Sequence, residues 1–293
     1  MASLKKRLGA LRERHAWVDH VVRMQQHFGE TRAGQQAGAI TYFAFLSFFP
    51  VLALAFFIVG LLSTVLDGAD QTLRAAIDSL FPRMIGPEEG QLQLRDFRDF
   101  SGLAGLLGLA GVLYAGLGWV SALRMALATV FELSDDERLG FVPGKLRDLV
   151  GLVSIGLTLL VAVGVSGLVS GFSSDLLGWL GLDQELSWLV KLLTVALGLA
   201  ANTVLFFTMF RLLGGEQVPT RSLVSGAVLG ALVFELLKRA AGLIIAQTQG
   251  QPAFQAFGIA LVMLVWISYF SRLVLYAASW AYTTQEARDA REK

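Results

Sequence analysis

The sequence predicts an all-α polytopic membrane protein with six transmembrane helices and with both termini in the cytoplasm. Three observations predict this fold: a composition of 55% hydrophobic and 16% charged residues, six long apolar stretches, and an uneven distribution of Lys and Arg between those stretches. The sequence contains no cysteine, which excludes a disulfide framework and a thiolate metal site.

The six apolar stretches have the length of membrane spans. A helix rises about 1.5 Å per residue and must cross about 30 Å of hydrocarbon, so each crossing needs about 20 apolar residues. We therefore expect a membrane domain at 37–283, in which an outer loop at 67–100 joins the first two spans. The expected spans are 37–66, 101–131, 149–172, 186–213, 223–245 and 254–282.

The basic residues orient this bundle, because cytoplasmic flanks are enriched in Lys and Arg. With the N-terminus inside, fifteen Lys and Arg residues lie on the inner face and four on the outer face. The head at 1–36 and the tail at 284–293 are then cytoplasmic. The head has the pattern of an amphipathic helix on the anionic inner leaflet, and packing against the end of the bundle is the alternative. Its three histidines, His15, His20 and His27, are expected on the surface of that helix.

Two sequence features predict local geometry within the spans. Pro50 removes one backbone hydrogen bond from the first span, so we expect a kink or break near it. Ser222, Gly226 and Gly230 form a stripe of small residues at every fourth position of the fifth span. Such a stripe permits close helix contact, here within one subunit, with dimerisation as the alternative.

Charged residues inside the spans are the main indication of function. A charge in hydrocarbon costs from about 3 to more than 10 kcal/mol, so it is normally paired, hydrated or bound by a ligand. The surplus of cations predicts an anionic client. The charged residues assigned to the apolar stretches are Arg124, Lys191, Glu235, Lys238, Arg239 and Arg272.

The single carboxylate of this set, Glu235, lies at a depth similar to those of Arg124 and Arg272. We expect these three to line one polar site, with Glu235 paired to Arg272 or to its helix neighbours Lys238 or Arg239. The hypothesis is that Arg124, Lys238, Arg239 and Arg272 bind an anionic headgroup and that Glu235 is their charge partner. In the structural alternative the cations snorkel, as Lys191 is expected to do near its helix end, and hold the bundle together.

Four segments carry a resemblance to a known family: 37–54 (AGAITYFAFLSFFPVLAL), 114–127 (YAGLGWVSALRMAL), 225–238 (SGAVLGALVFELLK) and 257–280. They resemble the YihY/BrkB-type bacterial inner-membrane proteins, a family once labelled ribonuclease BN. The resemblance implies a six-helix inner-membrane protein with a role in envelope lipid transport. Where the family's last segment ends in Gly-Ala-Glu, this chain has Ala278, Ser279 and Trp280, so no role of that carboxylate is carried over.

The residues argue against an enzyme and against a nucleic-acid partner. Acid–base cleavage of RNA needs His, carboxylates or a metal in an open cleft, but the histidines are confined to the head and form no metal-ligand pattern with the acids. We expect no catalytic residue, no metal and no cofactor. Anionic phospholipid is the expected ligand, and a homo-oligomer or partners in envelope lipid transport are further expectations. The alternatives are a small-anion or proton-coupled carrier and an envelope scaffold without transport.

Overall fold

The computed structural model describes Arg12 and residues 14–62, 103–134, 139–180, 187–214, 217–248 and 252–292. These residues form helices and short connections, with no strand among them. The predicted outer loop at 67–100 lies outside the described residues. The helices are α2 (Ala16–Glu30), α3 (Ala33–Leu62), α6 (Leu103–Val130), α7 (Phe141–Leu180), α8 (Ser187–Leu213), α9 (Thr220–Thr248), α10 (Pro252–Tyr282) and α11 (Gln285–Arg291).

Six of the described helices have the length of membrane spans. They are α3 and α6 to α10, and they contain 27 to 40 residues each. Four described segments are both long and apolar enough to cross a membrane: Leu113–Val130, Val195–Leu213, Thr220–Ala240 and Ala260–Tyr282. The all-helical membrane fold is therefore confirmed. The count of six crossings and the orientation of the termini stay predictions.

The start of α7 differs from the prediction. This helix begins at Phe141, whereas the sequence predicted a span that begins at 149. The additional turns carry Lys145, Arg147 and Asp148, which the prediction left outside the span. Their side chains bond to α6 and α8, and such pairing lets a charged segment pack as helix.

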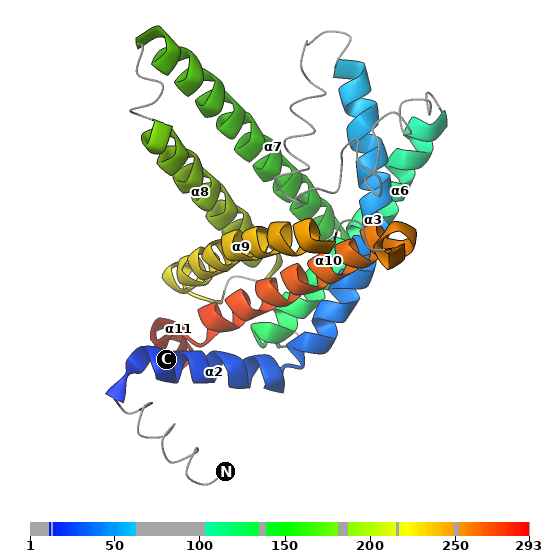
Figure 1. Cartoon of the computed structure of the whole chain (residues 1–293). Helices are drawn as coiled ribbons and strands as arrows, with labels where there is room; N and C mark the ends of the chain where they lie inside the picture. Colours follow the sequence, from blue (N-terminus) through cyan, green and yellow to red (C-terminus); the bar gives the residue numbers. More distant parts are fainter. Residues whose placement is uncertain are drawn as a thin grey trace.

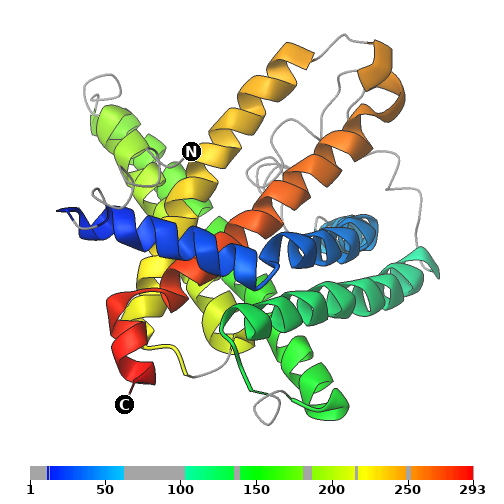
Figure 2. The same ribbon diagram turned by 90° about the horizontal axis from the view of Figure 1, so that it is seen from below.

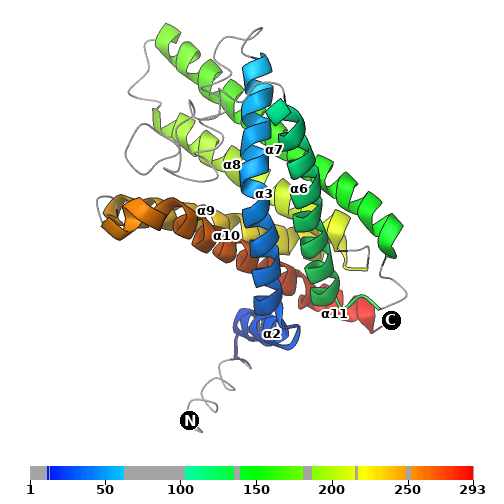
Figure 3. The same ribbon diagram turned by 90° about the vertical axis from the view of Figure 1, so that its right-hand side faces the viewer.

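The helices gather at one end of the molecule, across which α2 lies (Figures 1 and 2). Helices α3 and α6 run side by side, and α9 and α10 cross this pair at a steep angle (Figure 3). Helix α2 packs against α10, and α11 lies near it (Figure 1). We call this region the α2 end of the bundle.

The buried core is aromatic where α8, α9 and α10 meet. The ring of Phe206 contacts those of Phe210, Phe234 and Phe270, with centroids 6.0 to 6.3 Å apart. Phe206 and Phe210 are fully buried. Offset and edge-to-face arrangements at this spacing stabilise aromatic cores. These rings hold α9, which carries Glu235, Lys238 and Arg239, against α8 and α10.

Small residues bring α9 close to α10 and α8, as the stripe predicted. A Cβ atom placed on Gly226 would lie 2.5 Å from the carbonyl oxygen of Ala277, and one placed on Gly230 would lie 2.7 Å from the ring of Phe206. Ser222, at the start of the stripe, is buried. The stripe therefore serves packing within one subunit, which confirms that prediction.

Candidate functional site

The predicted charges of α9 form one local group. Glu235 Oε2 lies 2.8 Å from Lys238 Nζ, and Glu235 Oε1 lies 3.7 Å from Arg239 Nη2. The side chains of Glu235 and Lys238 are 25% and 20% exposed, whereas Arg239 is 61% exposed. Lys238 Nζ also lies 5.3 Å from the ring centroid of Phe234, within cation–π distance. We call Glu235, Lys238 and Arg239 the α9 charge group.

Arg272 does not join the α9 charge group. It is an exposed residue of α10, and it makes no ion pair or hydrogen bond to any described residue. Of the partners expected for Glu235, the structure shows Lys238 and Arg239 and not Arg272. The three residues Glu235, Arg124 and Arg272 therefore do not form one ion-paired site.

The carboxylate partner of Arg124 is Asp148, which the sequence prediction missed. Arg124 Nε donates to Asp148 Oδ1 at 2.6 Å, and Ser121 Oγ donates to Asp148 Oδ2 at 2.6 Å. Lys145 Nζ lies 3.1 Å from Ser121 Oγ and 3.9 Å from Asp148 Oδ2. Asp148 is fully buried, whereas Arg124 is 16% and Lys145 is 40% exposed. We call Ser121, Arg124, Lys145 and Asp148 the α6–α7 charge group.

The prediction left Asp148 outside the third span, whereas α7 begins at Phe141 and includes it. A signal was available in the sequence. Ser121 and Arg124 are three residues apart, as are Lys145 and Asp148, so each pair occupies one helix face. Two such polar pairs on helices joined by a short connection could have been predicted to meet.

Further contacts fix the start of α7. Arg147 Nε donates to the backbone carbonyl of Leu212 at 2.6 Å, near the end of α8, where carbonyl groups lack helical partners. A Cβ atom on Gly144 would lie 3.0 Å from Arg124 Nη2, so the guanidinium group lies directly against the backbone of α7 at Gly144. The α6–α7 charge group is therefore held between two helices rather than carried on one.

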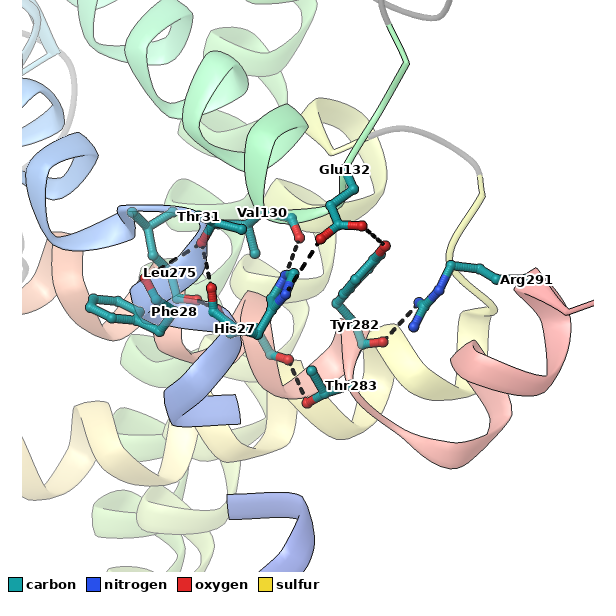
Figure 4. A network of polar contacts seen from close by, with 10 residues as sticks. His27, Phe28, Thr31, Val130, Glu132, Leu275, Tyr282, Thr283 and Arg291 are labelled. Carbon is teal, nitrogen blue, oxygen red and sulfur yellow. Dashed lines mark hydrogen bonds and ion pairs between the residues drawn. The ribbon is translucent and has the colours of Figure 1, made fainter. Parts of the chain in front are cut away.

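A third polar cluster joins four elements at the α2 end (Figure 4). His27 Nε2 lies 2.6 Å from the carbonyl oxygen of Val130, and His27 Nδ1 lies 3.7 Å from Glu132 Oε1. Tyr282 donates its hydroxyl to Glu132 Oε2 at 2.8 Å, and its ring stacks on His27 with centroids 4.5 Å apart. Arg291 donates to the carbonyl of Tyr282 and lies 3.8 Å from its ring centroid.

The histidines differ from the prediction in their burial. His27 is buried within this cluster, and His20 stacks on Trp280 with ring centroids 3.7 Å apart. His20 Nε2 also lies 3.0 Å from the carbonyl oxygen of Trp280. Only His15 is an exposed residue, as predicted. The prediction was wrong for His20 and His27 because the sequence alone does not show which face of α2 packs on α10.

Helix α2 therefore adopts the packed arrangement that was the alternative for the head. Phe28 stacks on Tyr276 with centroids 3.8 Å apart, and Tyr276 donates its hydroxyl to Gln25 at 3.1 Å. Trp17 and Val21 remain exposed on α2. Contact between this exposed face and the inner leaflet stays a prediction.

The structure describes the predicted features at Pro50 and Lys191 only in part. Helix α3 is continuous through Pro50, and the predicted kink stays a prediction. The side chains of Pro50 and Lys191 lie outside the described set. Among the described residues no group of three His, Cys, Asp or Glu is placed to hold a metal ion.

Comparison with known proteins identifies the family. The family model for the virulence factor BrkB matches residues 24–293. The chain belongs to the BrkB family. This match extends from α2 through α11 and includes both charge groups, and it confirms the resemblance seen in the sequence. Together with the long apolar helices, it identifies an integral membrane protein.

Individual BrkB relatives are similar over most of this chain. The inner membrane protein YhjD of Escherichia coli (strain K12) is 27% identical over 289 residues, which cover 95% of this chain and 85% of YhjD. An uncharacterised protein of Dickeya dadantii (strain 3937) is 26% identical, with 93% and 85% covered. A UPF0761 membrane protein of Psychrobacter sp. (strain PRwf-1) is 23% identical, with 92% of this chain and 49% of that protein covered. No solved structure matches the chain.

Proposed function

We propose that this BrkB-family protein engages an anionic lipid in the bacterial inner membrane and acts in an envelope lipid-transport route. The proposed location follows the name of the relative YhjD, an inner membrane protein. The proposed role is transport rather than catalysis. Its proposed ligands are membrane lipids. Its proposed partners are further copies of this chain, in a homo-oligomer, or other envelope proteins.

The observation that carries the proposal is the surplus positive charge of the α9 charge group. Glu235 lies 15 residues after Thr220, the first residue of α9, which is about 22 Å along the helix at 1.5 Å per residue. Its one negative charge faces the two positive charges of Lys238 and Arg239. An uncompensated charge at membrane depth is costly, so an anion that completes the group is favoured.

The surroundings of the α9 charge group suit an amphiphile better than a small ion. Leu232 and Leu236 on the same helix are 46% and 63% exposed, and Arg239 is 61% exposed. A lipid whose phosphate pairs with Arg239 would place its acyl chains along these leucines. Exposure of the cation to the lipid side also supports entry from the bilayer.

The proposal can be tested by lipid retention. The protein would be placed in nanodiscs of phosphatidylcholine with a minor share of phosphatidylglycerol, extracted gently, and analysed by native mass spectrometry. The double variant Lys238→Gln/Arg239→Gln should retain less phosphatidylglycerol. Each cation near an anionic surface contributes about 1 kcal/mol, so the loss should be about fivefold per charge removed. The matched control is Arg221→Gln, which removes an exposed cation at the start of α9.

A transport measurement separates the proposed function from its alternatives. Reconstituted protein should move labelled phosphatidylglycerol between leaflets or to an acceptor, and the double variant should do so more slowly. Movement of a small anion or of protons without movement of lipid would contradict the proposal and favour a solute carrier. Equal retention of phosphatidylglycerol and phosphatidylcholine by the wild type would also contradict it.

A further inference from the structure

The α6–α7 charge group has a buried carboxylate that its own members hold in place. Both oxygens of Asp148 accept a hydrogen bond at 2.6 Å, one from Arg124 and one from Ser121, and the side chain is fully buried. Asp148 is therefore held by two hydrogen bonds from within its own group. It fixes the position of Arg124 and of the Ser121 hydroxyl, which in turn accepts from Lys145.

The cations of this group keep unused donors. Arg124 bonds through Nε and weakly through Nη2, which leaves Nη1 without a partner in the described part of the chain. Lys145 carries three N–H donors, and the contacts to Ser121 and Asp148 use at most two of them. Two positive charges face one negative charge, so the group has a surplus of one positive charge. The N–H donors of a guanidinium group and an ammonium group can together bind the oxygens of one phosphate group.

Exposed apolar residues lie close in the sequence to the half-exposed cation Lys145 and to Arg124. Phe141, Val142 and Leu146 at the start of α7 are 81%, 74% and 64% exposed, and Met125 beside Arg124 is 62% exposed. Lys145 lies between Val142 and Leu146 in the sequence and is 40% exposed. This combination of apolar surface and half-exposed cation is the one that an amphiphilic anion contacts at a membrane interface.

We propose that the α6–α7 charge group is a separate binding site for the phosphate of an anionic phospholipid, in the leaflet at the α2 end. Lys145 and Arg124 bind the phosphate, Asp148 and Ser121 position those cations, and the acyl chains follow the apolar side chains of α7. The choice of a lipid over free phosphate rests on the proposed function. The site itself rests on the geometry of Lys145, Arg124 and Asp148.

The test varies the charge of Lys145 alone, because Arg124 and Asp148 are paired and their removal endangers the fold. Lys145→Gln keeps a hydrogen-bond donor for Ser121 and removes the surplus charge, and Lys145→Glu reverses it. Retention of phosphatidylglycerol in phosphatidylcholine nanodiscs should fall about fivefold for the first variant and further for the second. Gly144→Ala should also lower retention, since its methyl group displaces the guanidinium of Arg124 without a change of charge.

Two controls decide between a site and a general surface effect. Arg221→Gln removes another exposed cation from the start of a helix, and it should change retention less than Lys145→Gln does. Equal losses for both variants would overturn the inference, as would wild-type retention in Lys145→Glu with an unchanged melting temperature. Inorganic phosphate should compete weakly, and displacement of all lipid by phosphate at similar concentration would show a free-phosphate site instead.

The failure of this inference is distinguishable from that of the proposed function. Should lipid movement be absent while retention still depends on Lys145, the site stands and the transport proposal is wrong. Should Lys238→Gln/Arg239→Gln abolish lipid movement while Lys145→Glu changes neither movement nor retention, the transport proposal stands and this inference is wrong.

Discussion

Arg124 of α6 donates its Nε–H to the fully buried carboxylate of Asp148 of α7 at 2.6 Å. The two residues are 24 positions apart and belong to helices joined by residues 131–140. This ion pair ties α7 to α6 close to the start of α7. It also holds the one acidic group that offsets part of the positive charge of Arg124 and Lys145.

Removing one residue of this pair should destabilise the protein more than replacing both residues. Arg124→Ala or Asp148→Ala leaves one buried charge without its partner, and each should lower the free energy of unfolding by about 3 to 5 kcal/mol. The double variant Arg124→Ala/Asp148→Ala should be less destabilised than the sum of the single variants, as measured by thermal unfolding in detergent. Arg239→Gln is the matched control, because its 61% exposed side chain should contribute at most about 1 kcal/mol. Additive losses would contradict the pairing.

The close contact of α9 with α10 leads to a second prediction. Gly226→Ala places a methyl group 2.5 Å from the carbonyl oxygen of Ala277, so the helices must separate, and we expect a loss of about 1 to 3 kcal/mol or more. Gly198→Ala on α8 is the control, because a Cβ atom there meets no other atom within 4 Å. That control should be neutral or slightly stabilising, by up to about 1 kcal/mol, because Ala favours helix over Gly. Equal melting temperatures for both variants would refute the close contact.

Hydropathy and length located the long helices well because both follow from the chain alone. The predicted spans 101–131, 186–213 and 254–282 agree with α6, α8 and α10 within a few residues. The start of α7 was missed because Lys145, Arg147 and Asp148 suggested a loop. Charges that bond to other helices cannot be recognised from hydropathy, since hydropathy assigns each residue its value without its partner.

The candidate site was predicted only in part, for a related reason. Contacts within one helix, such as Glu235 with Lys238 and Arg239, follow from their spacing of three and four residues. Contacts between helices depend on rotation and register, which an estimate of depth does not supply. That is why Arg272 was expected beside Glu235, and why Asp148 was not expected beside Arg124.

The stacking of His20 on Trp280 predicts a pH dependence of stability. Burial lowers the pKa of His20 below its usual value of 6.5, and the hydrogen bond with the Trp280 carbonyl raises it in part. Between the two pKa values the unfolded chain binds more protons than the folded chain, so stability falls as the pH is lowered through about 6.5. The full contribution is present above that pH.

The variant His20→Phe isolates this contribution. It keeps a ring on Trp280 but cannot titrate, so its melting temperature should fall less steeply than that of the wild type between neutral pH and pH about 5. His15, His27 and Asp19 are present in both proteins and cancel in the comparison. Parallel curves for the two proteins would show that protonation of His20 is not linked to folding.

The hydroxyl of Tyr282 should contribute less to the stability of the α2 end than the ring of Tyr282 does. Tyr282→Phe removes the 2.8 Å hydrogen bond to Glu132 but keeps the contacts of the ring with His27 and Arg291. Glu132 is 56% exposed, so water can replace the lost donor, and we expect a loss of about 0.5 to 1.5 kcal/mol. Tyr282→Ala also removes the buried ring and should cost about 3 to 5 kcal/mol, with faster amide hydrogen exchange in α2 and α11. If Tyr282→Phe speeds exchange in both helices as much as Tyr282→Ala does, the hydroxyl rather than the ring holds these elements together.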